Sequence, residues 1–271
     1  MVLHRHGDML YKGMKGTVEE HLRQNIRPTI MSDSFDDSGN MLHTILNSWT
    51  DHKTSMQMIK DILMYMDRVY VPTNSVDNVE TLGVKVFNIQ ICQYPKITEN
   101  IRKILLKRID ENRNGEHIEQ AHEVKEICNM LMSLGVKSKD VYSKVFEDEF
   151  LRTTEIFYKS ESDQAIESLN SIDYVNKVNE RLKEEDKRTK TFLDSTSCKP
   201  VKERLIKVMI RDKAMRIVKN EGSGAVWLID NKRFSDLKNM HELLMLAGDD
   251  VHNQYRVVLP KTHENGIKTH F

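Results

Sequence analysis

The sequence predicts an all-α protein, and three observations support this fold class. Apolar residues recur at three- and four-residue steps through nearly the whole chain of 271 residues, which is the period of an amphipathic helix. The five prolines and eleven glycines fall mostly between these periodic segments, where helices are expected to end. Helices joined by short polar loops, without a short fixed repeat period, favour an elongated α-helical array or solenoid.

Each periodic segment predicts one helix. The expected helices lie over 8–27, around 42–49, and over 52–71, 77–93, 97–109, 117–134, 139–160, 171–193, 201–219 and 235–246. Pro28 is expected to end or bend the helix before it. Pro72, Pro95 and Gly135 are each expected to stop a helix. The stretch 32–40 predicts a polar loop.

Two segments depart from this pattern. Residues 171–193 are mostly charged, and we interpret them as a solvated helix held along one narrow edge by Val178 and Leu182. The tail from Asp249 to Phe271 loses helical periodicity, and its stretch 255–260 indicates a strand or an extended loop.

Composition and charge exclude several classes of protein. The 41 basic residues balance 41 acidic ones, so net charge gives no indication of binding to nucleic acid or to an anionic membrane. No apolar run approaches the roughly 18 residues of a membrane-spanning helix, and the N-terminus lacks the apolar core of a signal peptide. The three cysteines are widely spaced and odd in number, which favours a reducing compartment. We expect the protein to be located in the cytoplasm and the nucleus.

No motif in the sequence predicts a metal, cofactor or catalytic site. Asp110, Asn112 and Asn114 match the start of a calcium loop, but Ala121 stands where the loop needs a bidentate Glu, so we expect an inter-helix turn. The histidine pairs lack i, i+4 helical spacing, there is no CxxC, and the short GSG at 222–224 cannot cradle a phosphate. The prediction is a protein without a cofactor and without catalytic residues.

One helix carries a candidate binding face. With about 100° of rotation per residue, the helix over 52–71 gathers one apolar stripe. This predicted core stripe consists of Ile59, Ile62, Leu63, Met66 and Tyr70. The residues that point elsewhere are Met58, Asp61, Met64, Tyr65 and Arg68. Tyr, Arg and Met are enriched at the centres of protein interfaces, so these five predict a partner-binding face. The alternative is that another helix of the same chain covers them.

Three stretches carry a resemblance to a known family. They are TVEEHL (17–22), LNSWTDHKTSMQMIKDILMYMDRVYV (46–71) and ICNMLMSLG (127–135). They resemble the N-terminal region of the cullins, and most closely the branch that docks BTB-domain adaptors. The second of these stretches is the most specific, and the resemblance covers roughly residues 1–247.

The resemblance implies a fold and a role. It implies stacked five-helix cullin repeats: 1–70 as the first repeat without its first helix and most of its second, 77–193 as the second, 199–247 as the start of a third, and 248–271 as a divergent tail. It further implies a non-catalytic scaffold of a cullin–RING ubiquitin ligase, in which Tyr65 and Arg68 occupy adaptor-contacting positions.

The resemblance also implies which parts of a cullin are absent from this sequence. The C-terminal domain, which holds the RING-box subunit, is expected only in a longer protein. The alternative interpretation is a truncated, degenerate paralogue that binds adaptors without recruiting the RING subunit. Because the covering helix of the family is missing, we expect Leu10, Met14, Val18 and Leu22 to lack part of their packing.

Overall fold

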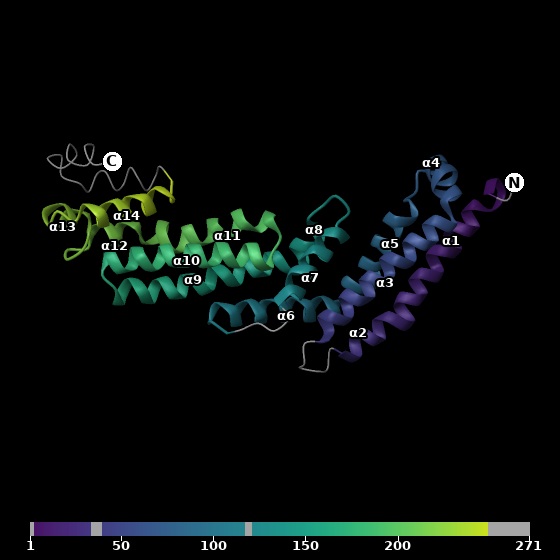
Figure 1. Ribbon diagram of the computed structural model, residues 1–271, viewed down its shortest axis with the longest axis horizontal. Coiled ribbons are helices and arrows are strands. Elements are labelled where there is room, and N and C mark those ends of the chain that lie inside the picture. Colours follow the sequence, from purple (N-terminus) through teal and green to yellow (C-terminus); the bar gives the residue numbers. More distant parts are fainter. Residues whose placement is uncertain (1–2, 34–39, 117–120, 249–271) are drawn as a thin grey trace. The chain divides into compact units, whose positions relative to one another are not determined.

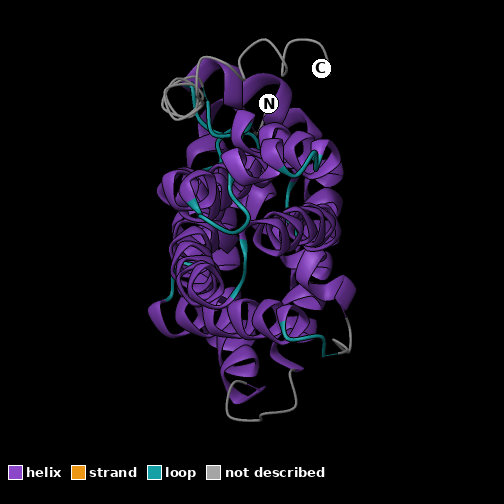
Figure 2. Ribbon diagram, turned by 90° about the vertical axis from the view of Figure 1, so that its left-hand side faces the viewer, coloured by secondary structure: helices purple, strands orange, loops and turns teal. Residues whose placement is uncertain are grey.

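The structure is a computed structural model that describes residues 3–33, 40–116 and 121–248 (Figure 1). Helices joined by short loops make up these residues, and no strand occurs among them (Figure 2). The chain divides into two compact units, 1–149 and 150–271, which we describe separately. The loop predicted over 32–40 and the extended stretch predicted over 255–260 lie largely or wholly outside the described residues.

The first unit is a set of long helices, several of which contain a wider π-helical turn. In chain order it contains α1 (Leu3–His21), a π turn (Leu22–Ile26), α2 (Arg27–Asp33), α3 (Asn40–Ile62), a π turn (Met66–Tyr70), α4 (Val71–Asn74), α5 (Val79–Phe87), a π turn (Asn88–Cys92), α6 (Pro95–Arg113), α7 (Ala121–Leu134), α8 (Asp140–Tyr142) and a π turn (Ser143–Glu147). The all-α prediction is therefore confirmed for the described residues.

The helix end predicted at Pro72 is wrong, and the helix before Pro28 does not end at that proline. The chain stays helical through Pro28 and Pro72, and each of these prolines follows a π turn. Proline has no N–H to donate and its ring crowds the carbonyl one turn earlier. A wider turn before the proline relieves that conflict, so the helix can continue. The predicted separate helices around 42–49 and over 52–71 likewise form one helix, α3, up to residue 62.

α3 and α5 pack closely in the first unit, where Figure 1 shows them side by side. The rings of Trp49 and Phe87 lie 4.9 Å apart, centroid to centroid, and the side chain of Met56 lies over Gly83. A salt bridge of 2.7 Å joins Lys60 to Glu80. Positions rise along α3 as they fall along α5, so the two helices run antiparallel.

The apolar strip expected on the first helix is partly exposed. Leu10 is exposed, Met14 and Val18 are half-buried, and Leu22 is fully buried. Tyr11 lies on the buried face, where its hydroxyl donates a hydrogen bond of 2.8 Å to the carbonyl of Asp77.

α6 agrees closely with its predicted face. The three- and four-residue spacing of apolar residues over 97–109 predicts one buried stripe. Of its members, Ile97, Ile101, Leu105 and Ile109 are buried and Ile104 is half-buried. Beyond α6 the chain turns at Gly115, which has φ +84°. The candidate calcium residue Asp110 lies in the last turn of α6 and forms a salt bridge of 3.1 Å with Arg113, so the predicted inter-helix turn starts only at Asn114.

The second unit begins near the start of α9 (Asp148–Ser168), which packs with α10 (Ser171–Phe192). It continues with a 3-10 turn (Ser195–Ser197), α11 (Cys198–Leu205), a π turn (Ile206–Ile210), a 3-10 turn (Arg211–Lys213), α12 (Ala214–Lys219), α13 (Ala225–Asp230) and α14 (Phe234–Met245). This boundary between the units falls inside the predicted second repeat, 77–193, and the repeat boundaries stay a prediction.

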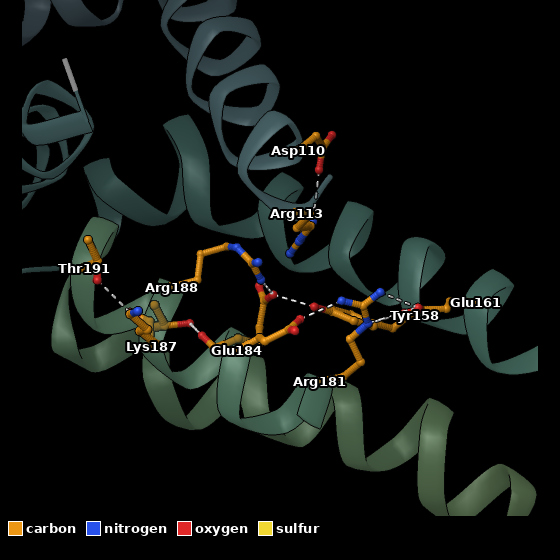
Figure 3. Close-up of polar contacts among 11 residues, drawn as sticks. Asp110, Arg113, Tyr158, Glu161, Arg181, Glu184, Lys187, Arg188 and Thr191 are labelled. Carbon is orange, nitrogen blue, oxygen red and sulfur yellow. Dashed lines mark hydrogen bonds and ion pairs between the residues drawn. The ribbon is translucent and has the colours of Figure 1, made fainter. Parts of the chain in front are cut away.

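α10 is more deeply packed than its charged sequence predicted. Glu185 is only 1% exposed, and it accepts a hydrogen bond of 2.6 Å from the hydroxyl of Tyr158 and pairs with the buried Arg188. Figure 3 shows Arg181 between the carboxylates of Glu161 and Glu184, at 2.8 and 2.6 Å. The prediction of a solvated helix held along a narrow edge is wrong for this part of α10, because Tyr158 of α9 and Arg188 of α10 itself satisfy the buried carboxylate of Glu185.

Candidate partner-binding face

The C-terminal part of α3 and the residues just beyond it expose a group of apolar and charged side chains. Met58, Ile62, Met64 and Tyr65 are 61%, 80%, 49% and 51% exposed. Asp61 and Arg68 are also exposed. We name the set formed by Met58, Asp61, Ile62, Met64, Tyr65 and Arg68 the candidate docking face. All five sequence-predicted residues are thus solvent-accessible, and none is covered by another described helix.

Ile62 corrects the predicted core stripe. The sequence placed it in the core, but it is the most exposed large apolar side chain of the described residues. Met56 contacts α5. Ile62 lies six residues later, and six residues correspond to about 240° of helical rotation relative to Met56. It therefore points away from α5, and nothing else among the described residues covers it.

The exposed apolar side chains follow a helical spacing of their own. Met58, Ile62 and Tyr65 stand at i, i+4 and i+7, the spacing of side chains along one stripe of a helix. This second stripe is visible in the sequence and indicates that Ile62 is exposed. However, Ile62 also fits the spacing of the neighbouring core stripe. From the sequence alone, a residue that fits both stripes of one helix cannot be assigned to either.

Buried side chains hold this segment in place. Met66 is completely buried, and Tyr70 lies against Gly7 and Tyr11, with its hydroxyl donating to Asp8 at 3.2 Å. A Cβ atom on Gly7 would lie 2.6 Å from the Tyr70 ring, so only glycine allows this contact. The candidate docking face therefore rests on an anchored backbone.

Asp67 ties the same segment to the next helix. Its carboxylate accepts a hydrogen bond of 3.0 Å from the backbone N–H of Val79, the first residue of α5. A carboxylate at this position satisfies an unpaired donor of the helix N-terminus and suits its positive dipole end.

The two charged members of the face differ in their local partners. Asp61 accepts a hydrogen bond of 2.9 Å from the side chain of Gln57, one turn earlier. For Arg68 the described part of the chain provides no ion-pair partner, so its guanidinium keeps its donors for another molecule. An exposed aromatic, aliphatic side chains and an available guanidinium form a surface that can bind a protein.

The described residues offer little for other functions. Among them, no group of three His, Cys, Asp or Glu side chains is placed to hold a metal ion. No helix in residues 3–33, 40–116 and 121–248 is long and apolar enough to cross a membrane.

Comparison with known proteins shows the family of this chain. A family model described as the cullin alpha solenoid domain matches residues 1–261. The chain belongs to the cullin family. The match extends into the segment after Gly248, which the sequence resemblance had left out.

Individual cullins are similar along most of this cullin chain. It is 36% identical to Cullin-3 of Dictyostelium discoideum over 266 residues, which is 98% of the chain and 34% of that relative. It is 32% identical to Cullin-3 of Caenorhabditis elegans, covering 93% of the chain and 32% of the relative. Human Cullin-4A is 30% identical, covering 89% and 30%. The chain spans about a third of the length of the curated relatives it matches.

Proposed function

We propose that this cullin chain docks a BTB-domain substrate adaptor through the candidate docking face and serves as a non-catalytic scaffold of a cullin–RING ubiquitin ligase. The observation that carries the proposal is the exposed line of Met58, Ile62 and Tyr65 on a helix whose opposite face is buried. Similarity to Cullin-3 proteins supports the choice of adaptor class.

The chemistry of the face supports a protein partner. Tyr65 and Ile62 together can bury a large apolar area at low cost in conformational entropy, and Arg68 can make charge-assisted hydrogen bonds at the edge. The anchored backbone around Met66 and Tyr70 means that little ordering is needed when the partner binds.

The RING-box subunit belongs to the proposal only for a longer protein that contains the C-terminal domain. We also propose that the complex acts in the cytoplasm and the nucleus. Fluorescent tagging of the chain in cells tests that location directly.

The proposal is tested by Tyr65→Ala and Arg68→Ala. Titration calorimetry against a panel of purified BTB-domain proteins should give a Tyr65→Ala affinity about thirtyfold weaker than wild type, equivalent to about 2 kcal/mol. Arg68→Ala should weaken binding with a smaller dependence on salt concentration, because one charged contact is lost. Urea unfolding should change by about 0.5 kcal/mol or less for both variants, since both side chains are exposed.

Ile89→Ala is the matched control. Ile89 is an exposed aliphatic residue of the same unit, in the π turn that follows the end of α5 remote from the candidate docking face. It should bind as wild type does. Absence of binding by wild type across the panel, or equal affinity of wild type and Tyr65→Ala, would contradict the proposal.

A further inference from the structure

A groove in the first unit lies between α3, α5 and the C-terminal end of α7. It has a volume of about 750 Å³, which is within the usual size of a binding site. Its floor consists of Trp49, His52 and Met56, which are 5%, 8% and 4% exposed. Its rim consists of exposed side chains, among them Lys53, Thr54, Gln57, Met58 and Glu80.

The floor offers apolar surface and one unused hydrogen-bond acceptor. Trp49 and Met56 supply the apolar surface. The Nε2 of His52 donates to the carbonyl of Gly83 at 2.9 Å, so its Nδ1 carries a lone pair, and no described group donates to that atom. An occupant is therefore stabilised by an apolar side chain on the floor and by an N–H or O–H group directed at His52.

The uncompensated charge of the rim belongs to Lys53. Its Nζ lies 5.4 Å from the centre of the Trp49 ring, and it has no ion-pair partner among the described residues. Glu80 also lines the groove, but it pairs with Lys60 at 2.7 Å, so its charge is already offset. Asp61 lies eight residues after Lys53, about 12 Å along the helix, which is beyond the screening length of about 8 Å at physiological salt. The rim therefore favours a carboxylate on the occupant.

The groove and the candidate docking face are continuous along α3. One stripe with a four-residue step contains Trp49, Lys53, Gln57 and Asp61. The first three line the groove, and the last belongs to the face. The side chain of Gln57 donates a hydrogen bond of 2.9 Å to Asp61, and Met58 belongs to both surfaces.

One partner of ordinary size can cover both surfaces. Tyr65 follows Lys53 by twelve residues, about 18 Å of helix. A standard protein interface covers about 800 Å² on each partner, which corresponds to a patch about 30 Å across. A protein that binds the candidate docking face therefore extends over the groove.

We propose that the groove binds an acidic segment of the same BTB adaptor that docks on the candidate docking face. This inference rests on the proposed function and adds the chemistry that selects among adaptors. The segment places a carboxylate at Lys53, an apolar side chain on the floor, and an N–H or O–H donor at Nδ1 of His52. An adaptor with a basic residue opposite Lys53 is expected to bind more weakly.

Charge reversal at the rim tests the carboxylate. The probe is the BTB-domain protein of the panel that binds wild type most tightly. In titration calorimetry at physiological salt, Lys53→Glu should weaken its affinity by about tenfold, and Lys53→Gln should weaken it less because it adds no repulsion. Lys96→Glu is the matched control, because Lys96 is an exposed lysine of α6 that does not line the groove. It should bind as wild type does.

A thiol on the rim tests occupancy independently of charge. Cys198→Ser removes the half-buried native thiol, and Thr54→Cys in that background places a new one at the groove. With the adaptor at about ten times its Kd, alkylation of the new thiol should slow by about tenfold, because only the free chain reacts. Mass spectrometry of the peptide that contains position 54 separates it from the cysteines of the adaptor. Lys96→Cys in the same background should react equally with and without the adaptor.

The outcomes separate this inference from the proposed function. Suppose that Tyr65→Ala weakens binding while Lys53→Glu binds as the control does, or while the new thiol stays unprotected. The groove is then empty in the complex, and this inference is wrong. Absence of binding by wild type, or no effect of Tyr65→Ala, would contradict the proposed function and this inference together. Thermal unfolding checks each variant, and if Lys53→Glu unfolds early, Lys53→Gln and the thiol decide.

Discussion

At the scale of the residue, neighbouring positions of one helix have opposite environments. Met66 is completely buried, while Ile62, one turn earlier, is 80% exposed. Both side chains are large and apolar, so residue type alone does not predict which of the two is buried. The difference arises because α5 and the first helix cover the line through Met56 and Met66 and leave the neighbouring line open.

Met66→Ala and Ile62→Ala should therefore have opposite consequences. Met66→Ala should lower the free energy of unfolding by about 2–5 kcal/mol, because it leaves a cavity in a packed site. Ile62→Ala should change it by about 0.5 kcal/mol or less, because the side chain is already in solvent. Urea unfolding of the two variants makes the comparison, and a larger loss for Ile62→Ala would place the helix in a different rotation.

His52 should make stability depend on pH. Burial lowers the pKa of His52 from its ordinary value of 6.5, the nearby His21 acts in the same direction, and the hydrogen bond to Gly83 partly opposes them. Its Nε2 must donate to the Gly83 carbonyl at 2.9 Å, since that oxygen can only accept. The neutral ring is therefore the form that the fold favours.

The sign of this effect follows from proton binding. Below pH 6.5 the unfolded chain takes up a proton at His52 that the folded chain resists, so the His52 contribution is complete above pH 6.5 and decreases as pH falls. The decrease is at most about 1.4 kcal/mol per pH unit. Urea unfolding between about pH 7.5 and 5.5 should show a weaker pH dependence in His52→Gln than in wild type. Parallel curves would contradict this assignment.

At the scale of the element, close approach between helices depends on single small residues. α3 reaches α5 because Gly83 has no side chain: a Cβ atom there would lie 2.6 Å from Cγ and 3.0 Å from Cε of Met56. The same interface contains the contact of Trp49 with Phe87. The position of α3, and with it the candidate docking face, rests on this packing.

Gly83→Ala should lower the free energy of unfolding by about 1–3 kcal/mol, because the added methyl group overpacks the interface. Gly13→Ala is its matched control, since a Cβ atom at Gly13 in α1 would meet nothing within 4 Å. The control should raise stability by about 0.5–1 kcal/mol through better helix propensity. Thermal unfolding of both variants checks the difference in sign.

At the scale of the whole molecule, two compact helical units belong to one cullin alpha solenoid domain. A solenoid buries its core between successive helical layers, and each layer contacts mainly its neighbours. Each added helical layer therefore lengthens such a domain more than it widens it. The family therefore predicts an extended particle in solution.

Small-angle X-ray scattering should give a radius of gyration well above about 18 Å, the value for a compact domain of 271 residues. The measurement should be extrapolated to low protein concentration, because self-association would also raise the radius. A radius near the compact value would contradict the solenoid arrangement.

The amino-acid sequence by itself determined the helical class and the faces of the regular helices. Ile97, Ile101 and Leu105 are buried as predicted because each repeats the same period within one element, and a local period needs no knowledge of neighbours. The same reasoning found Tyr65 and Arg68 as exposed residues.

Only the tertiary structure decided what depends on neighbours. Ile62 is exposed because no described helix covers it, and Glu185 is buried because Tyr158 and Arg188 satisfy it. The helix continues through Pro28 because a wider turn precedes it. Period and composition describe one element at a time, whereas burial of a side chain is settled by the element packed against it.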